Sequence, residues 1–343
     1  MMLHPCHWAE HVDAWTKNPY DPQMPVIKYE DLLRPRGGPF RNMTRDPIWP
    51  LDFKKDIYSQ TGEDGVIGAI LGVVGDRDGW CVEFGAWDGQ HLSNTRNLIE
   101  SHSYKAVLIE GDYEKWASLE AFYKGNNRII PINAFVGFGE TDGLDATLGR
   151  TSIPLGFDFL SIDIDGNDFH VWNAMRTYRP KLICIEFNPT IPTGCDFVQP
   201  ANTEVNQGAS LSSLVCLGKA KGYELASVLQ FNAFFVRSDL FALLEIDDNS
   251  AQTLRTDLSS VTYFFQGFDG HIFLQGNRRL IWHDLDIPEE AIQILPAALQ
   301  KYPAKYRFAE KWVFDGYRHW LGFKQQFRKH QKRMVRRHRP LVR

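Results

Sequence analysis

The sequence predicts an α/β protein, with a doubly wound and mostly parallel sheet of seven strands that ends in an antiparallel edge hairpin. Apolar runs of strand length alternate with helical patterns over residues 57–222. One of these runs, 81–84, leads into a glycine turn, and two further runs, 223–229 and 231–237, follow each other almost directly. Alternating strands and helices indicate a parallel sheet, whereas a very short connection between two strands indicates an antiparallel pair.

The charge of the chain is unevenly distributed. Its 343 residues contain 38 Lys or Arg and 42 Asp or Glu, a formal net charge of −4. Residues 324–343 hold nine of the basic residues and none of the acidic ones, which leaves 29 basic against 42 acidic side chains, or −13, for residues 1–323. An acidic body with a basic tail predicts that the tail meets an anionic partner, and argues against a protein that coats nucleic acid.

The cysteines and the N-terminal sequence indicate a cellular location. The five cysteines form no C-x-x-C pair, and Cys81 and Cys184 fall in expected core strands. Such usage favours a reducing compartment. Neither an apolar run of membrane-spanning length nor a signal-peptide pattern is found. We therefore expect a cytoplasmic protein, with peripheral contact at the inner membrane face through its tail.

Residues 1–56 differ in composition from the segment that follows. Seven prolines between positions 19 and 50 break any long helix, so we expect an extended arm, followed by the α/β domain over 57–240. The domain opens with a helix over 66–74. Because this helix leads directly into the glycine strand, Gln60 and Glu63 are expected beside a ligand, although a capping role at the helix start stays open.

The first strand, 81–84, contains one charged residue, Glu83, and ends at Gly85 and Gly89. A buried strand that runs into a glycine turn brings backbone N–H groups up to a ligand at the carboxyl end of the sheet. The dinucleotide pattern G-x-G-x-x-G is absent. A polar loop and a helix to about residue 102 follow.

The second and third strands place polar residues where an adenosine would bind. The second strand, 106–109, ends in Glu110, roughly 20 residues beyond the glycine turn, where an acidic side chain accepts hydrogen bonds from the two ribose hydroxyls. A helix over 113–124 and a strand over 128–133 come next. The end of that strand, at Asn133, is expected to meet the adenine.

Polar side chains also follow the fourth and fifth strands, 157–162 and 181–185. They are Asp163 and Asp165 after the fourth strand, and Glu186 and Asn188 after the fifth. The carboxyl ends of neighbouring parallel strands meet at one edge of a sheet, so these side chains can converge. Oxygen ligands of this kind predict a site for Mg²⁺ or Mn²⁺ and exclude a typical zinc site.

A metal at that edge would lower the pKa of an acceptor hydroxyl and orient it for reaction. Asp163, Asp165 and His170 are the catalytic candidates, with His170 as a possible general base. Structural roles stay open, because Asn167 or Asp168 can cap the helix over 169–176 and His170 can pack against it.

Several motifs together carry a family resemblance. They are 59–64 with Gln60 and Glu63, 82–89 with Glu83, 93–95 with Ser93 and Asn94, 109–110 with Glu110, and 158–166. Over about residues 57–240 they resemble the FkbM-like class I methyltransferases, and E-x-G-x-x-x-G is the form that methyltransferases using S-adenosylmethionine usually show. The resemblance implies S-adenosylmethionine as donor and an acceptor hydroxyl on a glycan, a lipid-linked molecule or a secondary metabolite.

By that resemblance the cofactor residues are Glu83, Gly85, Gly89 and Glu110, and we expect Gln60, Glu63, Ser93, Asn94 and Asn133 around them. Two other functions stay open. Asp163-Ile164-Asp165 is also the D-x-D pattern of metal-dependent glycosyltransferases, but the glycine turn followed by Glu110 describes an adenosine site. A non-catalytic binding protein on the same fold is the second alternative.

After the helix over 211–221 and the hairpin, residues 241–323 are expected to form an extension packed on the domain, with helix and turn over 275–302. An aromatic run, 308–327, then continues into the basic tail, 324–343. A basic helix with aromatic side chains is typical of peripheral attachment to anionic lipid. A solvated tail is the alternative, and nucleic acid is a weaker third.

Overall fold

The computed structural model describes residues 45–75, 78–302 and 305–337. Most of the expected N-terminal arm lies outside these residues. Its last part forms the 3₁₀ helix η1 (Trp49–Phe53), in which Trp49 is buried. The Trp49 indole Nε1 donates a hydrogen bond to the carbonyl of Leu244 at 3.1 Å. The end of the arm is therefore attached to the segment that follows the sheet.

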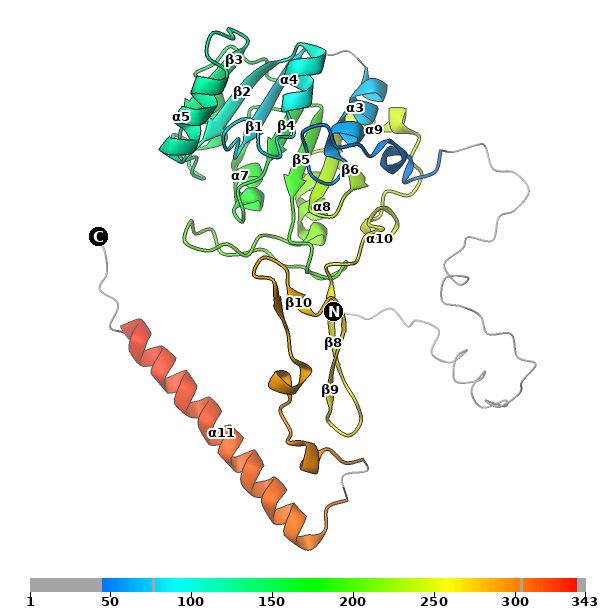
Figure 1. Cartoon of the computed structure of the whole chain (residues 1–343), viewed down its shortest axis with the longest axis vertical. Coiled ribbons are helices and arrows are strands. Elements are labelled where there is room, and N and C mark those ends of the chain that lie inside the picture. The colour runs from blue at the N-terminus through cyan, green and yellow to red at the C-terminus, as the bar shows by residue number, and fades with distance from the viewer. Residues whose placement is uncertain (1–44, 76–77, 303–304, 338–343) are drawn as a thin grey trace, which may run out of the picture. The chain divides into compact units, whose positions relative to one another are not determined.

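A seven-stranded sheet forms the centre of the α/β domain (Figure 1). Its strands are β1 (Trp80–Phe84), β2 (Lys105–Glu110), β3 (Ile129–Asn133), β4 (Phe159–Ile162), β5 (Leu182–Glu186), β6 (Tyr223–Val228) and β7 (Asn232–Arg237). They lie in the order β3-β2-β1-β4-β5-β7-β6, and β7 is antiparallel to both of its neighbours. This is the strand order of the class I methyltransferase fold, and it confirms the mostly parallel sheet with an antiparallel edge hairpin.

Helices cover both faces of this sheet. They are α3 (Glu63–Val74), α4 (Arg96–His102), α5 (Tyr113–Phe122), α6 (Leu144–Leu148), α7 (Asp168–Ala174) and α8 (Leu211–Ala220). Successive strand residues point to opposite faces, so Cys81 packs with the core under α3, α4 and α5, while Val82 packs with the core under α6, α7 and α8. Two cores of this kind identify a doubly wound fold, as predicted.

The strand order of the sheet reverses between β1 and β4, because β2 and β3 extend from one side of β1 and the chain then returns to the other side. β1 pairs with β2 on one side and with β4 on the other, so the ends of these three strands lie side by side. In open α/β sheets, ligands bind outside the carboxyl ends of the strands at such a switch point. The loops that follow β1, β2 and β4 are therefore positioned to form a ligand site.

The segment after β7 contains short elements and then one long helix. They are α9 (Ser238–Phe241), η2 (Ala242–Leu244), α10 (Ala251–Leu254), β8 (Thr262–Gln266), β9 (Ile272–Gly276), β10 (Arg279–Leu280), β11 (Leu285–Asp286), η3 (Glu289–Ile292), η4 (Ala297–Leu299) and α11 (Phe308–Arg337). The expected helix and turn over 275–302 is thus partly wrong, since the end of β9 and the hairpin of β10 and β11 take its first part. Pro288 and Pro296 each lie directly before a 3₁₀ turn, a position where the missing N–H of proline is tolerated.

A buried arginine ties this segment to the α/β domain. The Arg255 guanidinium donates hydrogen bonds to the carbonyls of Pro189 at 2.6 Å and Ile191 at 2.7 Å, in the loop after β5. Its side chain is 4% exposed. None of the helices in the described ranges combines the length and the apolarity needed to cross a bilayer.

Candidate functional site

A cavity of about 300 Å³ opens at the carboxyl ends of β1, β2 and β4, and we call it the donor cavity. Gly85, Glu110, Phe135 and Asp163 are among the residues that line it. Gly85 has a φ of +86°, and a Cβ there would lie 1.8 Å from the Asp163 carbonyl oxygen. Only glycine therefore allows the turn after β1 to lie this close to the end of β4.

Glu110 is held in the donor cavity by the loops on either side of it. Its Oε2 accepts a hydrogen bond from the Trp87 backbone N–H at 2.9 Å, and its Oε1 accepts one from the Asp112 N–H at 2.8 Å. A carboxylate oxygen can accept more than one hydrogen bond, so each oxygen keeps the capacity to bind a ligand hydroxyl. Glu110 can therefore accept hydrogen bonds from a bound ligand while it holds both loops.

The far wall of the donor cavity comes from the segment after β3. Ala134, Phe135 and Val136 line it, and the Phe135 ring is 86% exposed. Asn133 does not line the cavity, because its Nδ2 donates to the carbonyls of Glu110 at 2.9 Å and Gly111 at 3.2 Å. Asn133 therefore holds the end of β3 against β2, while its neighbours present an apolar wall.

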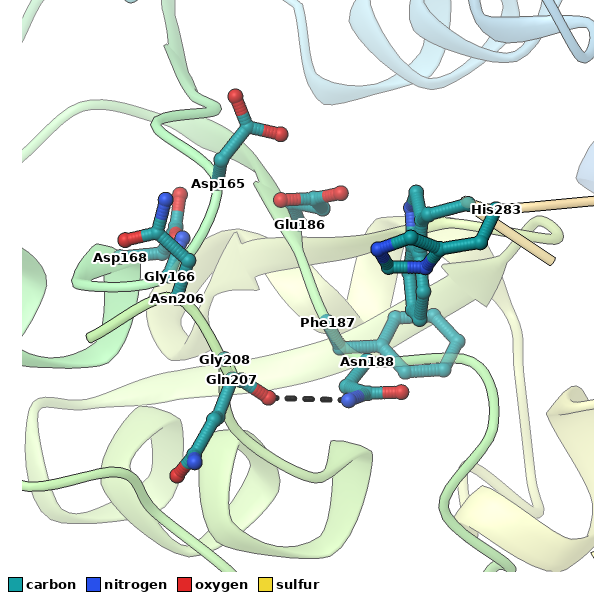
Figure 2. A pocket seen from close by; sticks show the side chains of 11 residues that line it. Asp165, Gly166, Asp168, Glu186, Phe187, Asn188, Asn206, Gln207, Gly208 and His283 are labelled. Atoms are coloured by element: carbon teal, nitrogen blue, oxygen red, sulfur yellow. Dashed lines mark hydrogen bonds between the residues drawn. The ribbon is translucent and has the colours of Figure 1, made fainter. Parts of the chain in front are cut away.

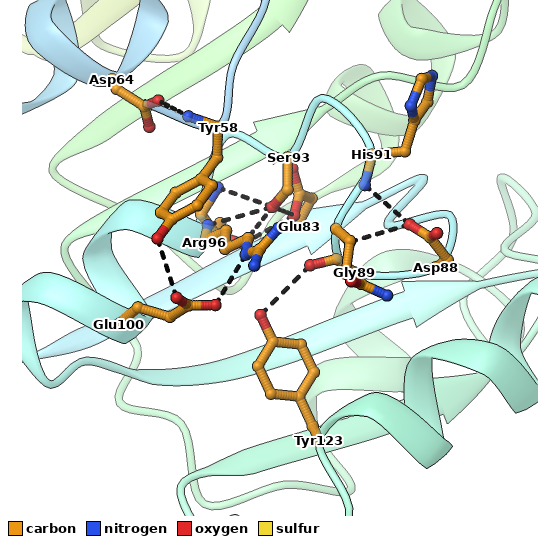
Figure 3. Close-up of polar contacts among 12 residues, drawn as sticks. Tyr58, Asp64, Glu83, Asp88, Gly89, His91, Ser93, Arg96, Glu100 and Tyr123 are labelled. Carbon is orange, nitrogen blue, oxygen red and sulfur yellow. Dashed lines mark hydrogen bonds and ion pairs between the residues drawn. The ribbon is translucent and has the colours of Figure 1, made fainter. Parts of the chain in front are cut away.

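Glu83 lies behind the donor cavity and does not line it. Its carboxylate accepts hydrogen bonds from Ser93 Oγ at 2.6 Å, the Asn94 N–H at 2.7 Å and Thr95 Oγ1 at 2.7 Å. Burial raises the pKa of Glu83, and these hydrogen bonds oppose the rise because they favour the ionised form. Figure 3 shows Ser93 beside Glu83 in this network. Glu83 thus fixes the loop that follows the glycine turn.

The other expected cofactor residues also have structural partners. Gly89 has a φ of +72°, and its carbonyl accepts a hydrogen bond from the Tyr123 hydroxyl at 3.3 Å. Glu63 is buried and accepts hydrogen bonds from the Thr61 N–H at 2.8 Å and from Asn232 Nδ2 at 3.1 Å, while the Gln60 side chain is exposed. Neither Gln60 nor Glu63 lines the donor cavity, and Glu63 instead joins the turn before α3 to β7.

An acidic cluster of Asp163, Asp165 and Glu186 lies beside the donor cavity, at the carboxyl ends of β4 and β5. One carboxylate oxygen each from Asp163, Asp165 and Glu186 lies within 4.8 Å of the others. Burial raises the pKa of Asp163 to about 8, helped by the negative charges of Asp168 and Asp165. Burial and the charge of Asp163 raise the pKa of Glu186 well above its usual range. Carboxyl groups this close favour a shared proton or a bound cation.

A second cavity of about 300 Å³, the acceptor cavity, adjoins the first and shares Asp165 and Asn206 with it (Figure 2). Glu186 lines it too. Trp282 and His283, from the turn between β10 and β11, contribute another part of its wall. The sequence reasoning missed these two residues, because they lie beyond the segment that carries the resemblance and belong to no motif.

Two predicted residues near the acidic cluster are engaged elsewhere. Asn188 lines the acceptor cavity, but its Oδ1 accepts from Thr190 N at 2.9 Å and Thr190 Oγ1 at 2.6 Å, and its Nδ2 donates to the Gln207 carbonyl at 2.9 Å (Figure 2). His170 lines neither cavity, and its Nε2 lies 2.8 Å from the Gln199 carbonyl. The structure thus brings together three of the four proposed metal ligands.

Asp168 serves the turn after β4. Its Oδ1 accepts from the Ile164 N–H at 3.0 Å, and its Oδ2 accepts from the Gly166 N–H at 2.9 Å. Burial raises the pKa of Asp168 to about 6. Both oxygens hold the backbone between Asp163 and α7, which places Asp165, with a φ of +56°, at the edge of both cavities.

No protein-family model and no curated protein sequence matches this chain. Among solved structures, the METTL16 MTase domain aligns with 51% of this chain and 66% of its own length, at 11% identity and a TM-score of 0.33. A SAM-dependent methyltransferase from Aquifex aeolicus aligns over 56% and 97%, at 12% identity and a TM-score of 0.32. The N-terminal domain of EvdMO1 with SAH bound aligns over 52% and 82%, at 13% identity and a TM-score of 0.36. The chain thus spans just under two thirds of the first of these proteins.

Proposed function

We propose that this chain is an S-adenosylmethionine-dependent O-methyltransferase. The observation that carries the proposal is the donor cavity, where the glycine turn after β1, Glu110 after β2 and the apolar segment after β3 meet at the switch point of the sheet. An adenosine needs a hydrogen-bond acceptor for its ribose and an apolar wall for its base. Glu110 and Phe135 supply the two.

The acidic cluster supports a reaction at an oxygen. S-adenosylmethionine, when bound, supplies a methyl group on a positively charged sulfur. Asp163 lines the donor cavity, and Asp165 lines both cavities, so these carboxyl groups stand where an acceptor hydroxyl would meet the donor. The hydroxyl must lose its proton as it attacks, and the ionised form of Asp163, whose pKa is raised to about 8 by burial, is basic enough to take that proton.

The cluster also fits a divalent cation. Three carboxylates this close together would be stabilised by Mg²⁺ or Mn²⁺, which prefer oxygen ligands, and burial together with neighbouring negative charge raises the pKa of two of them, Asp163 and Glu186. We propose Asp163, Asp165 and Glu186 as the ligands, and a metal held there would lower the pKa of the acceptor hydroxyl. Asn188 is left out of this set, because its amide oxygen already accepts two hydrogen bonds.

The walls of the acceptor cavity support a hydroxyl-rich acceptor, such as a glycan, a lipid-linked molecule or a secondary metabolite. Glu186, Asn206 and Gln207 offer hydrogen-bonding groups, and Trp282 offers an apolar ring. This matches the acceptor class that the FkbM-like motifs imply.

Calorimetric titration with S-adenosylhomocysteine tests the donor, and a parallel titration with UDP-glucose in Mn²⁺ tests the glycosyltransferase alternative. We expect S-adenosylhomocysteine to bind with a dissociation constant in the micromolar range or lower, and we expect no binding of UDP-glucose. Binding of UDP-glucose without S-adenosylhomocysteine would assign the acidic cluster to a nucleotide sugar. If neither binds, the donor cavity has no adenosine function.

A further inference from the structure

The C-terminal helix α11 presents an open aromatic face. Trp312, Trp320, Phe323 and Phe327 are 70%, 51%, 68% and 54% exposed. Their spacings of eight, three and four residues repeat with the period of an α-helix, so the four side chains share one side of α11. Large aromatic side chains grouped in this way on a surface mark a binding site.

Two other aromatic side chains of α11 are already used within the chain. The Phe314 ring stacks on Tyr306 with centroids 4.7 Å apart, and the Tyr317 hydroxyl donates to the Ile294 carbonyl at 2.6 Å. These contacts hold the helix against the segment that precedes it. Packing of α11 within its own chain therefore does not account for the open aromatic face.

The side chains of the open face contact only their own helix among the described ring pairs. Phe323 pairs with Phe327 at 6.4 Å, and Trp320 pairs with Tyr317 at 5.7 Å. The Lys324 ammonium lies 4.8 Å from the Trp320 ring. A cation beside an aromatic ring, at the edge of an apolar face, is the arrangement of residues that sit at the level of lipid headgroups.

The charge of the sequence selects the partner. Nine Lys or Arg and no acidic residue lie in 324–343, and α11 extends through this run to Arg337 without a break at residue 324. An anionic bilayer offers negative headgroups to the basic residues and an apolar layer directly below to the aromatic ones. A nucleic acid duplex would match the charge but would leave the aromatic face in water, because its bases are already stacked on one another.

We propose that α11 is an interfacial helix that binds membranes containing anionic phospholipid. The aromatic face enters the headgroup boundary, and the basic residues of α11 between Lys324 and Arg337 contact the headgroups. The proposal is independent of methyl transfer, since no residue of α11 lines the donor or the acceptor cavity.

The test is sedimentation of the full chain with vesicles of phosphatidylcholine alone and of phosphatidylcholine mixed with phosphatidylglycerol. The decisive variant is Trp320→Ser combined with Phe323→Ser. Serine has about the same helix propensity as Trp and Phe, so α11 itself should persist. The matched control is Leu155→Ser, which removes a 58% exposed apolar side chain from the turn before β4.

We expect the intact chain and the Leu155→Ser control to bind the anionic vesicles, more weakly as salt is raised, and not the neutral ones. The double variant should bind at least about tenfold more weakly, with an unchanged melting temperature. The proposal is overturned if the intact chain fails to sediment with anionic vesicles at low salt. It is also overturned if the double variant binds as well as the intact chain, because the basic residues would then act without the aromatic face.

Discussion

Replacement of Glu110 by glutamine tests the donor site most directly. Glu110 is 8% exposed, and each of its oxygens accepts one backbone hydrogen bond, from Trp87 and from Asp112. Glutamine keeps the shape but removes the charge and replaces one acceptor oxygen with an NH₂ group. The NH₂ group takes the place of one of the two oxygens. The backbone N–H of Trp87 or Asp112 that pointed at this oxygen then has no acceptor, and the ligand hydroxyl on that side loses its acceptor too.

Two separate losses follow from this geometry. A hydrogen bond from a ribose hydroxyl to a charged acceptor contributes about 1.5–3 kcal/mol, so the affinity for S-adenosylhomocysteine should fall by about tenfold to a hundredfold. One unsatisfied backbone N–H costs about 1–3 kcal/mol of folding free energy. The melting temperature should therefore fall by several degrees in a chain of this size.

Calorimetry with S-adenosylhomocysteine and thermal unfolding separate the two losses. The matched control is Glu114→Gln, which makes the same change at an exposed position of α5 that lines neither cavity. We expect the control to keep both its affinity and its melting temperature. An unchanged affinity in Glu110→Gln, together with a lowered melting temperature, would refute the ribose assignment and leave Glu110 as an anchor of its two loops.

Three further predictions concern Asp163, Arg255 and Lys221. Asp163→Asn should weaken Mn²⁺ binding at least about tenfold in a calorimetric titration and leave the affinity for S-adenosylhomocysteine nearly unchanged, whereas equal Mn²⁺ binding would exclude Asp163 as a ligand. Arg255→Met should destabilise the chain by about 2–4 kcal/mol and expose residues 256–302 to limited proteolysis, because the three hydrogen bonds from Arg255 to the loop after β5 are lost with it; an unchanged digestion pattern would contradict this role. Burial, followed by the charge of Arg176, lowers the pKa of Lys221 from 10.5 to about 8. Between about pH 8 and pH 10.5, Lys221 is therefore mostly protonated in the unfolded chain and mostly neutral in the folded one. The free energy of unfolding should rise as the pH rises through this range, because the unfolded chain binds more protons. Lys221→Met should remove this rise in urea titrations.

Local patterns in the sequence determined the architecture and the outline of the site. The alternation of buried strands and helices leads to the observed parallel sheet, since each strand must be covered on both faces. The same alternation puts Gly85, Glu110 and Asp163 at the carboxyl ends of β1, β2 and β4. Residues at the ends of adjacent parallel strands must lie at one edge, so their convergence on the donor cavity follows from strand order alone.

Tertiary structure decided which of the polar residues face the cavities. Glu83 and Asn188 stand at the positions that the motifs indicate, yet their side chains hold loops through several hydrogen bonds each. His170 turns to the Gln199 carbonyl, whereas Trp282 and His283 reach the acceptor cavity from a hairpin more than 90 residues after β5. Strand and helix periodicities specify the face on which a residue lies, but the partner of a polar side chain depends on which distant loop returns beside it. A local pattern contains no information about that return, so the folded chain alone settles these contacts.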